Sequence, residues 1–181
     1  MRTFVALPLP EPWITPLMRA QSAVRGGRPV DADDLHVTLA FLDDQPEDRL
    51  DALHEALEAK PLPAAALAPR SYSAIGTPPR MFALDLDATP GLTALHTAIR
   101  SAARTSGIAL PRDRFRPHVT LRRFTRGDAA GDGIGPALER LGPPDLASET
   151  ARLCALWSSV LTPQGPIYDV LASYPLREPA L

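Results

Sequence analysis

Alternation of apolar and polar residues predicts a series of strands in this chain of 181 residues. The clearest run covers residues 35–42, where Leu35, Val37, Leu39 and Phe41 would form one apolar face, because side chains two apart in a strand point the same way. Shorter or weaker runs predict the remaining strands at residues 2–7, 67–75, 80–87, 118–124, 152–161 and 167–173. The last two flank a proline- and glycine-containing turn and are expected to form a hairpin.

Apolar residues spaced three and four apart predict helices between these strands. Such helices are expected at residues 11–24, 46–60, 89–106 and 136–141. The third begins with the pair Thr89-Pro90, an N-cap followed by proline at the first helical position. Residues 127–135 hold several glycines and are expected to form a flexible linker. This order of elements, with few long parallel crossovers, favours an α+β fold with helices outside antiparallel sheets.

One tetrapeptide occurs twice, as His36-Val37-Thr38-Leu39 and as His118-Val119-Thr120-Leu121. In each strand the His and the Thr share one face, while the Val and the Leu share the other. Two half-buried strands with His and Thr on their polar sides would give the same pattern, because Thr is a common strand residue. The identity of two complete copies favours a functional pair and indicates two related lobes.

Two imidazoles and two hydroxyls suit acid–base cleavage of a phosphodiester. Imidazoles titrate near neutral pH, so one can accept a proton from water while the other protonates a leaving oxygen. Threonine hydroxyls can donate hydrogen bonds to the non-bridging oxygens of a phosphate. A metal site is not expected, because two histidines without a neighbouring carboxylate provide too few ligands. His54 and His96 are expected on helix surfaces.

The composition limits the classes of function that the chain can have, but it does not identify a substrate. A net charge of −2 gives no overall field for a polyanion, so contact with nucleic acid requires a local basic patch. The basic residues are nearly all arginines, which suit bidentate contact with phosphate, although genomic bias gives the same composition. The single cysteine, Cys154, excludes an internal disulfide and a cysteine-based zinc site. Neither a signal peptide nor a membrane span is expected, which predicts a cytoplasmic protein.

Through these motifs the chain resembles the 2H phosphoesterase superfamily, and within it the bacterial and archaeal RNA 2′,3′-cyclic phosphodiesterases, also called 2′–5′ RNA ligases. The resemblance covers nearly the whole chain, from the opening strand through both motif strands to the closing hairpin. Two positions depart from the family pattern: Asp43 stands where glycine is common, and Tyr174 stands where tryptophan is frequent.

The resemblance implies a single bilobal domain over residues 1–181, with two antiparallel-sheet lobes, outer helices, pseudo-twofold symmetry and a central cleft. It implies metal-independent opening of an RNA 2′,3′-cyclic phosphate to a 2′-phosphomonoester, without a cofactor, and 2′–5′ ligation when an RNA 5′-hydroxyl replaces water. By motif match His36 would be the proton donor and His118 the proton acceptor. Thr38 and Thr120 would hold the phosphate oxygens. The residues alone leave open which histidine is the acid, and we expect a monomer.

Four further residues are candidates for contact with RNA. The family match favours Arg123, whereas simple alternation places Arg122 on the face of His118 unless the strand bulges. Phe115 would either stack on a base or plug the core, and Arg80 is a weaker candidate for a phosphate contact. The alternatives to this RNA enzyme are a phosphodiesterase acting on small cyclic nucleotides or 2′–5′ oligonucleotides, and a non-catalytic nucleotide- or RNA-binding module.

Overall fold

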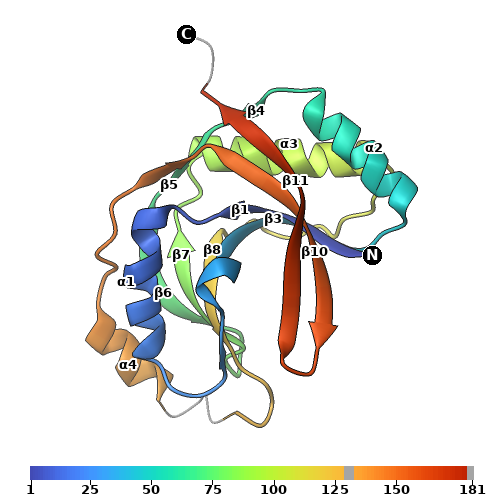
Figure 1. Ribbon diagram of the computed structural model, residues 1–181. Coiled ribbons are helices and arrows are strands. Elements are labelled where there is room, and N and C mark those ends of the chain that lie inside the picture. The colour runs from blue at the N-terminus through green and yellow to red at the C-terminus, as the bar shows by residue number, and fades with distance from the viewer. Residues whose placement is uncertain (129–132, 179–181) are drawn as a thin grey trace.

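A nine-stranded sheet runs through the computed structural model, which describes residues 1–128 and 133–178 (Figure 1). The strand order is β4–β11–β10–β1–β3–β8–β7–β6, with β2 paired to β8 outside this path and β5 and β9 forming a separate pair. Neighbouring strands are antiparallel except β11 and β4, which are parallel. The strands are β1 (Arg2–Pro8), β2 (Arg28–Pro29), β3 (His36–Asp44), β4 (Leu62–Pro63), β5 (Ala65–Leu67), β6 (Pro69–Ile75), β7 (Met81–Leu86), β8 (His118–Arg123), β9 (Glu149–Ala151), β10 (Leu153–Thr162) and β11 (Gly165–Arg177).

Helices cover this sheet and confirm the α+β class. They are α1 (Glu11–Ser22), α2 (Glu47–Glu58), α3 (Pro90–Thr105) and α4 (Ile134–Leu141), with a short 3₁₀ turn η1 (Ala32–Asp34) before β3. The predicted stripes are buried, with Leu53 of α2 and Leu95 of α3 fully inaccessible. Burial of one such leucine contributes about 2 kcal/mol. The Thr89 hydroxyl accepts the Leu92 amide at 3.3 Å, so the predicted N-cap of α3 is confirmed.

The two lobes are halves of one sheet and are related by a pseudo-twofold axis. The axis passes between β3 and β8, which pair at Val37 and Val119. On one side β1 flanks β3, and on the other β7 flanks β8. Two helices cross to the opposite half: α1 follows β1 but packs on β8, and α3 follows β7 but packs on β3. This exchange ties the halves together and fixes the two motif strands side by side.

Both motif strands contain a β-bulge at the same motif position. In β3 the register with β1 skips Leu39, and in β8 the register with β7 skips Leu121. The bulge reverses the alternation that follows it. Phe41, predicted on the buried face, is therefore 44% exposed, which corrects that prediction. Asp43 adopts φ 61°, the left-handed conformation that explains why glycine suits this position.

Several strands begin or end at other residues than predicted, because very short strands pair with them or divide them. The run predicted at residues 67–75 is divided into β5 and β6, since β5 leaves the large sheet to pair with β9. The final strand extends to Arg177, because its end pairs with β4. Part of the predicted linker at 127–135, residues 129–132, lies outside the described residues. Within the described ranges, no helix is long and apolar enough to cross a membrane.

Candidate active site

The four polar side chains of the two motifs lie on one face of the central strand pair. Val37 and Val119 are fully buried on the other face. Extending the antiparallel register from this pair sets His36 opposite Thr120 and Thr38 opposite His118. The two histidines are then diagonal neighbours, with backbones about 7–8 Å apart. A phosphate group can fit between two imidazoles on such positions.

Each histidine makes the same type of hydrogen bond to the main chain. Nδ1 of His36 lies 2.6 Å from the carbonyl oxygen of Asp34, and Nδ1 of His118 lies 2.8 Å from that of Arg116. Both carbonyls belong to the residue two positions earlier in the chain. Because a carbonyl oxygen only accepts, Nδ1 donates in both rings, and Nε2 is left to exchange a proton.

The surroundings of His36 are aromatic. Its ring centroid lies 4.9 Å from that of Phe4, 5.6 Å from that of Tyr168 and 5.8 Å from that of Trp157. Burial lowers the pKa of His36 to about 4, and the positive charge of Arg123 and the nearby His118 act in the same direction. The bond to the Asp34 carbonyl opposes this shift. His36 is therefore neutral at neutral pH when the cleft is empty.

The surroundings of His118 are polar and contain an ion pair. Asp85 of β7 is the direct cross-strand partner of His118 and is 9% exposed. Its carboxylate accepts two bonds from the guanidinium of Arg116, both at 3.1 Å, and Arg116 also donates to the Ser73 hydroxyl at 3.2 Å. The residue whose carbonyl orients His118 is thus fixed by its own side chain. Within residues 1–128 and 133–178, His36 has no equivalent ion pair, and Pro8 occupies its cross-strand position.

The bulge at Leu121 decides which arginine faces the cleft. It returns Arg123 to the motif face, where the guanidinium contacts the Met81 sulfur at 3.7 Å and borders the hollow beside His36. Arg122 instead donates to the carbonyls of Gly26 and Gln21, at 2.8 and 3.3 Å, at the end of α1. The alternation argument for Arg122 therefore does not hold. Arg123 and Phe41 occupy the same position relative to their motifs.

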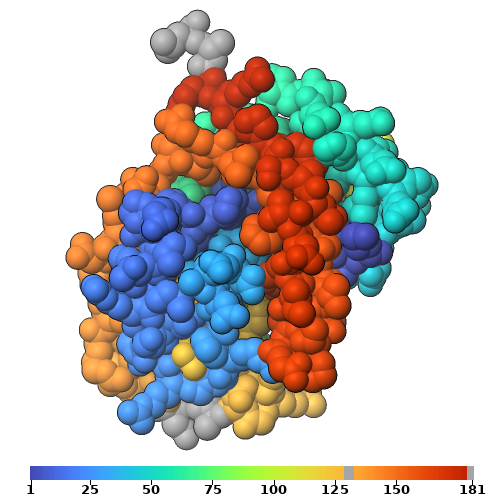
Figure 2. Space-filling model, in the orientation of Figure 1, coloured from blue at the N-terminus to red at the C-terminus, as the bar shows by residue number. Residues whose placement is uncertain are grey.

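One hollow is lined by motif side chains, and a second lies beside the second motif without being lined by its histidine or threonine. On the His36 side, one of about 270 Å³ is lined by His36, Thr38, Arg123 and Tyr168 among others. It shares Arg123 and Tyr168 with a neighbouring hollow of about 250 Å³ beside Arg28. The tip of the β10–β11 hairpin (red) stands against the light-blue segment there, as Figure 2 shows, where Arg28 donates to the Pro163 carbonyl at 3.2 Å. On the His118 side, a larger hollow of about 640 Å³ begins at Asp85 and Pro117.

Comparison with known proteins assigns the family. Residues 8–160, which contain both motifs, match the family model described as the 2′-5′ RNA ligase superfamily. The chain belongs to this superfamily. An RNA 2′,3′-cyclic phosphodiesterase of Thermus thermophilus is 33% identical over 193 aligned residues, covering 98% of this chain and 91% of the relative. One of Archaeoglobus fulgidus is 26% identical, covering 94% and 98%.

Solved structures of similar proteins share the fold of this 2′-5′ RNA ligase superfamily member. A phosphoesterase structure has a TM-score of 0.81 at 26% identity and covers 98% of this chain and 99% of its own. The structure of E. coli LigT complexed with 3′-AMP has a TM-score of 0.78 at 26% identity, covering 98% of each chain.

The remaining residues named from the sequence, Phe115 and Arg80, do not line the hollow beside His36. The Phe115 ring stacks on His96 of α3, with centroids 3.8 Å apart, and Phe115 also lines the hollow on the His118 side. Arg80 is exposed in the turn before β7, where its main chain bonds to Ile75 and Phe124.

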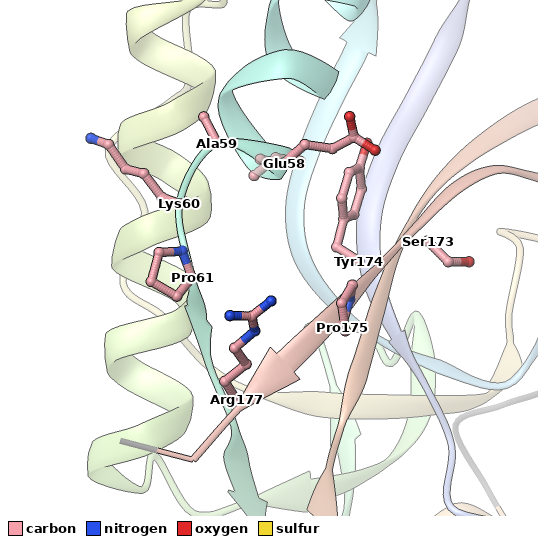
Figure 3. A pocket seen from close by; sticks show the side chains of 9 residues that line it. Glu58, Ala59, Lys60, Pro61, Ser173, Tyr174, Pro175 and Arg177 are labelled. Carbon is pink, nitrogen blue, oxygen red and sulfur yellow. The ribbon is translucent and has the colours of Figure 1, made fainter. Parts of the chain in front are cut away.

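A further hollow lies at the outer edge of the sheet in this superfamily member. It measures about 460 Å³, and Glu58, Lys60 and Arg177 surround it in Figure 3, with the Tyr174 ring at its wall. Its lining comes from α2, the segment after α2 and β11, not from the motif strands. Among the described residues, no group of three or more His, Cys, Asp or Glu side chains is placed to hold a metal ion.

Residues that sequence reasoning missed shape both half-sites. Tyr168 and Trp157 surround His36 from strands far along the chain, and Asp85 supports His118 through Arg116. Only the adjacency of Arg116 to the second motif was a sequence signal. The others depend on strand pairing between distant segments.

Proposed function

We propose that this chain is an RNA 2′,3′-cyclic phosphodiesterase, which opens the cyclic phosphate at an RNA end to a 2′-phosphomonoester. The observation that carries the proposal is the pairing of the two motif strands, with two oriented imidazoles and two hydroxyls on one face. The relatives in Thermus thermophilus and Archaeoglobus fulgidus that bear this name support it. A nucleotide in the cleft is also supported by the LigT structure complexed with 3′-AMP.

In the proposed mechanism His118 accepts a proton from water, and His36 donates one to the leaving 3′ oxygen. The water oxygen bonds to phosphorus as the bond from phosphorus to O3′ breaks, and the 2′-phosphate remains. Thr38 and Thr120 donate hydrogen bonds to the non-bridging oxygens. Arg123 offsets the negative charge that builds up on them.

To act as a proton donor, His36 must first be protonated. In the empty site its lowered pKa disfavours the protonated form. A bound phosphate anion supplies the opposite charge and raises the pKa of His36, since an imidazolium beside an anion is stabilised. A proton held in this desolvated site is also easily released. The acid is thus formed with the substrate and not before it.

When an RNA 5′-hydroxyl takes the place of water, the same groups form a 2′–5′ linkage. In cleavage of that linkage the histidines exchange roles, by microscopic reversibility. The proposal therefore includes ligation at the same cleft.

Turnover of an oligonucleotide ending in a 2′,3′-cyclic phosphate tests the proposal. His36→Ala and His118→Ala should each lower kcat by roughly 10²- to 10⁴-fold, the usual contribution of a general acid or base. His54→Ala, a histidine of α2 bonded to Tyr174, serves as the matched control and should retain the rate. EDTA should have no effect, and the product should carry a 2′-phosphate. Full activity in both motif variants would contradict the proposal, as would tight binding without product.

A further inference from the structure

The large hollow on the His118 side is lined by basic residues, two of which, Arg70 and Arg114, have no part in the proposed hydrolysis of a cyclic phosphate. Its volume of about 640 Å³ exceeds that of the hollow beside His36, at about 270 Å³. Arg70, Arg114 and Arg116 line it, together with Ser71 and Phe115. A water nucleophile needs no such space, so the hollow has room for a larger reactant.

The charges in this hollow favour an anion. Arg116 is neutralised by Asp85, at 3.1 Å. Arg70 has only a loose partner, Asp87 at 4.0 Å, and both side chains are more than half exposed. Arg114 forms no ion pair with any residue in the described part of the chain. Two arginines thus remain able to bind a phosphate group.

The position of Arg70 follows from another irregularity of the sheet. The register between β6 and β7 skips Arg70, which leaves it without a cross-strand partner next to Ser71. Ser71 lies opposite Asp85, which in turn lies opposite His118. Arg70 therefore lies next to the end of a row of cross-strand neighbours that runs from His118 through Asp85 to Ser71.

The in-line geometry of phosphoryl transfer indicates which of the two RNA strands would bind in this hollow. The entering and leaving oxygens lie in line on opposite sides of phosphorus. In the proposed function the leaving O3′ and its ribose are on the His36 side, where Phe4, Phe41 and Tyr168 line the smaller hollow. The entering oxygen comes from the His118 side. The large hollow begins at Asp85, the cross-strand partner of His118, and so offers space on that side for a strand that brings a 5′-hydroxyl.

We propose that Arg70 and Arg114 form a subsite for the first phosphodiester of the 5′-hydroxyl RNA strand, the one 3′ to the nucleoside that carries the reacting O5′. The subsite rests on the proposed function and adds the second polynucleotide of the ligation reaction. In ligation O5′ bonds to phosphorus, the bond to O3′ breaks, and the proton of the 5′-hydroxyl passes to His118 while O3′ receives one from His36. In the reverse direction O3′ attacks and O5′ leaves with a proton, so the same subsite holds the leaving strand.

Cleavage of two 2′–5′-linked substrates tests this subsite. One is adenylyl-(2′–5′)-adenosine, and the other carries an added 3′-phosphate on its 5′-linked nucleoside. The native enzyme should cleave the phosphorylated substrate with a kcat/KM roughly tenfold higher, because two arginines gain a phosphate partner. The double variant Arg70→Ala/Arg114→Ala should lose this preference, and added salt should weaken it. Arg19→Ala, which removes an exposed arginine of α1, should keep it.

The outcomes separate the subsite from the proposed function. Equal cleavage of both substrates by the native enzyme, or an unchanged preference in the double variant, would overturn the subsite. Hydrolysis of a cyclic-phosphate oligonucleotide without cleavage of either 2′–5′ substrate would also overturn it while leaving the proposed function intact. If the double variant slowed hydrolysis of a cyclic-phosphate oligonucleotide but not of a cyclic mononucleotide, these arginines would bind the other strand, and the assignment would fail. Absence of any hydrolysis would refute the proposed function itself.

Discussion

The desolvated position of His36 makes the stability of the fold depend on pH. The pKa of His36 is lowered from its ordinary value of 6.5 to about 4, chiefly by burial. Between these values the unfolded chain binds a proton at His36 that the folded chain does not. The free energy of unfolding therefore decreases as the pH falls from about 6.5 to about 4.

The size of this effect follows from the shift. At about 1.4 kcal/mol per pH unit, the full penalty is about 3 kcal/mol, an upper value because the ring keeps some contact with solvent. Most of it, about 2.5 kcal/mol, is lost between pH 7.5 and pH 4.5. This amount is a large part of the stability of an ordinary domain, about 5–15 kcal/mol.

The variant His36→Asn removes the titrating group, and urea unfolding at a series of pH values measures the result. Between pH 7.5 and pH 4.5 the native protein should lose about 2 kcal/mol more stability than the variant. Any uniform cost of the substitution cancels in this difference. Equal losses in the two proteins would refute the reasoning.

Two aromatic variants test the cause of the shift. Tyr168→Ala opens the pocket around His36, so the pKa should rise and the loss in acid should shrink. Phe41→Ala is the matched control, since Phe41 lines the same hollow and its ring does not stack on His36. The same loss in both variants would show that desolvation by the aromatic pocket is not the cause.

Two further predictions concern the second motif. Arg123→Ala should lower kcat/KM for a cyclic phosphate by roughly tenfold or more, as expected for a charge beside the phosphate. Arg122→Ala should retain that rate and lower the free energy of unfolding by about 1 kcal/mol through loss of its bonds to α1; the opposite pattern would reverse their roles. Asp85→Asn should lower kcat about tenfold with little change in KM, because Arg116 loses the partner that fixes its carbonyl. Ser73→Ala removes only one bond to Arg116 and should have little effect; unchanged kcat in Asp85→Asn would assign that ion pair to stability alone.

Local patterns predicted the elements whose partners lie close in the chain. The stripes of α2 and α3 are set by a period of 3.6, and the valines of both motifs by a period of two, so their burial follows from the sequence. The strands β2 and β4 have two residues each, which is too short for any period to appear. Their positions depend on the strands β8 and β11 that they join.

The bulges could not be predicted for a related reason. A bulge is a mismatch in register between two paired strands. The partners of β3 and β8 are β1 and β7, which lie elsewhere in the chain, so neither motif strand alone contains the information that places its bulge. The prediction for Phe41 failed at this point, and the choice between Arg122 and Arg123 stayed open. The aromatic pocket has the same origin, since Tyr168 lies 132 positions after His36 in the sequence and meets it only through β10 and β1.

The two half-sites carry identical motifs but differ in the residues around them. These are the residue just beyond each bulge and the cross-strand neighbour of each histidine. The motifs share the tetrapeptide, the bond from Nδ1 to a carbonyl two residues earlier, and the bulge at the leucine. The equivalent position beyond the bulge is Phe41 in one half and Arg123 in the other. The residue beside the histidine is proline in one half and Asp85 in the other. His36 therefore lies in an apolar pocket that lowers its pKa, whereas a polar network holds His118. In the proposed function this difference makes His36 the proton donor and His118 the proton acceptor.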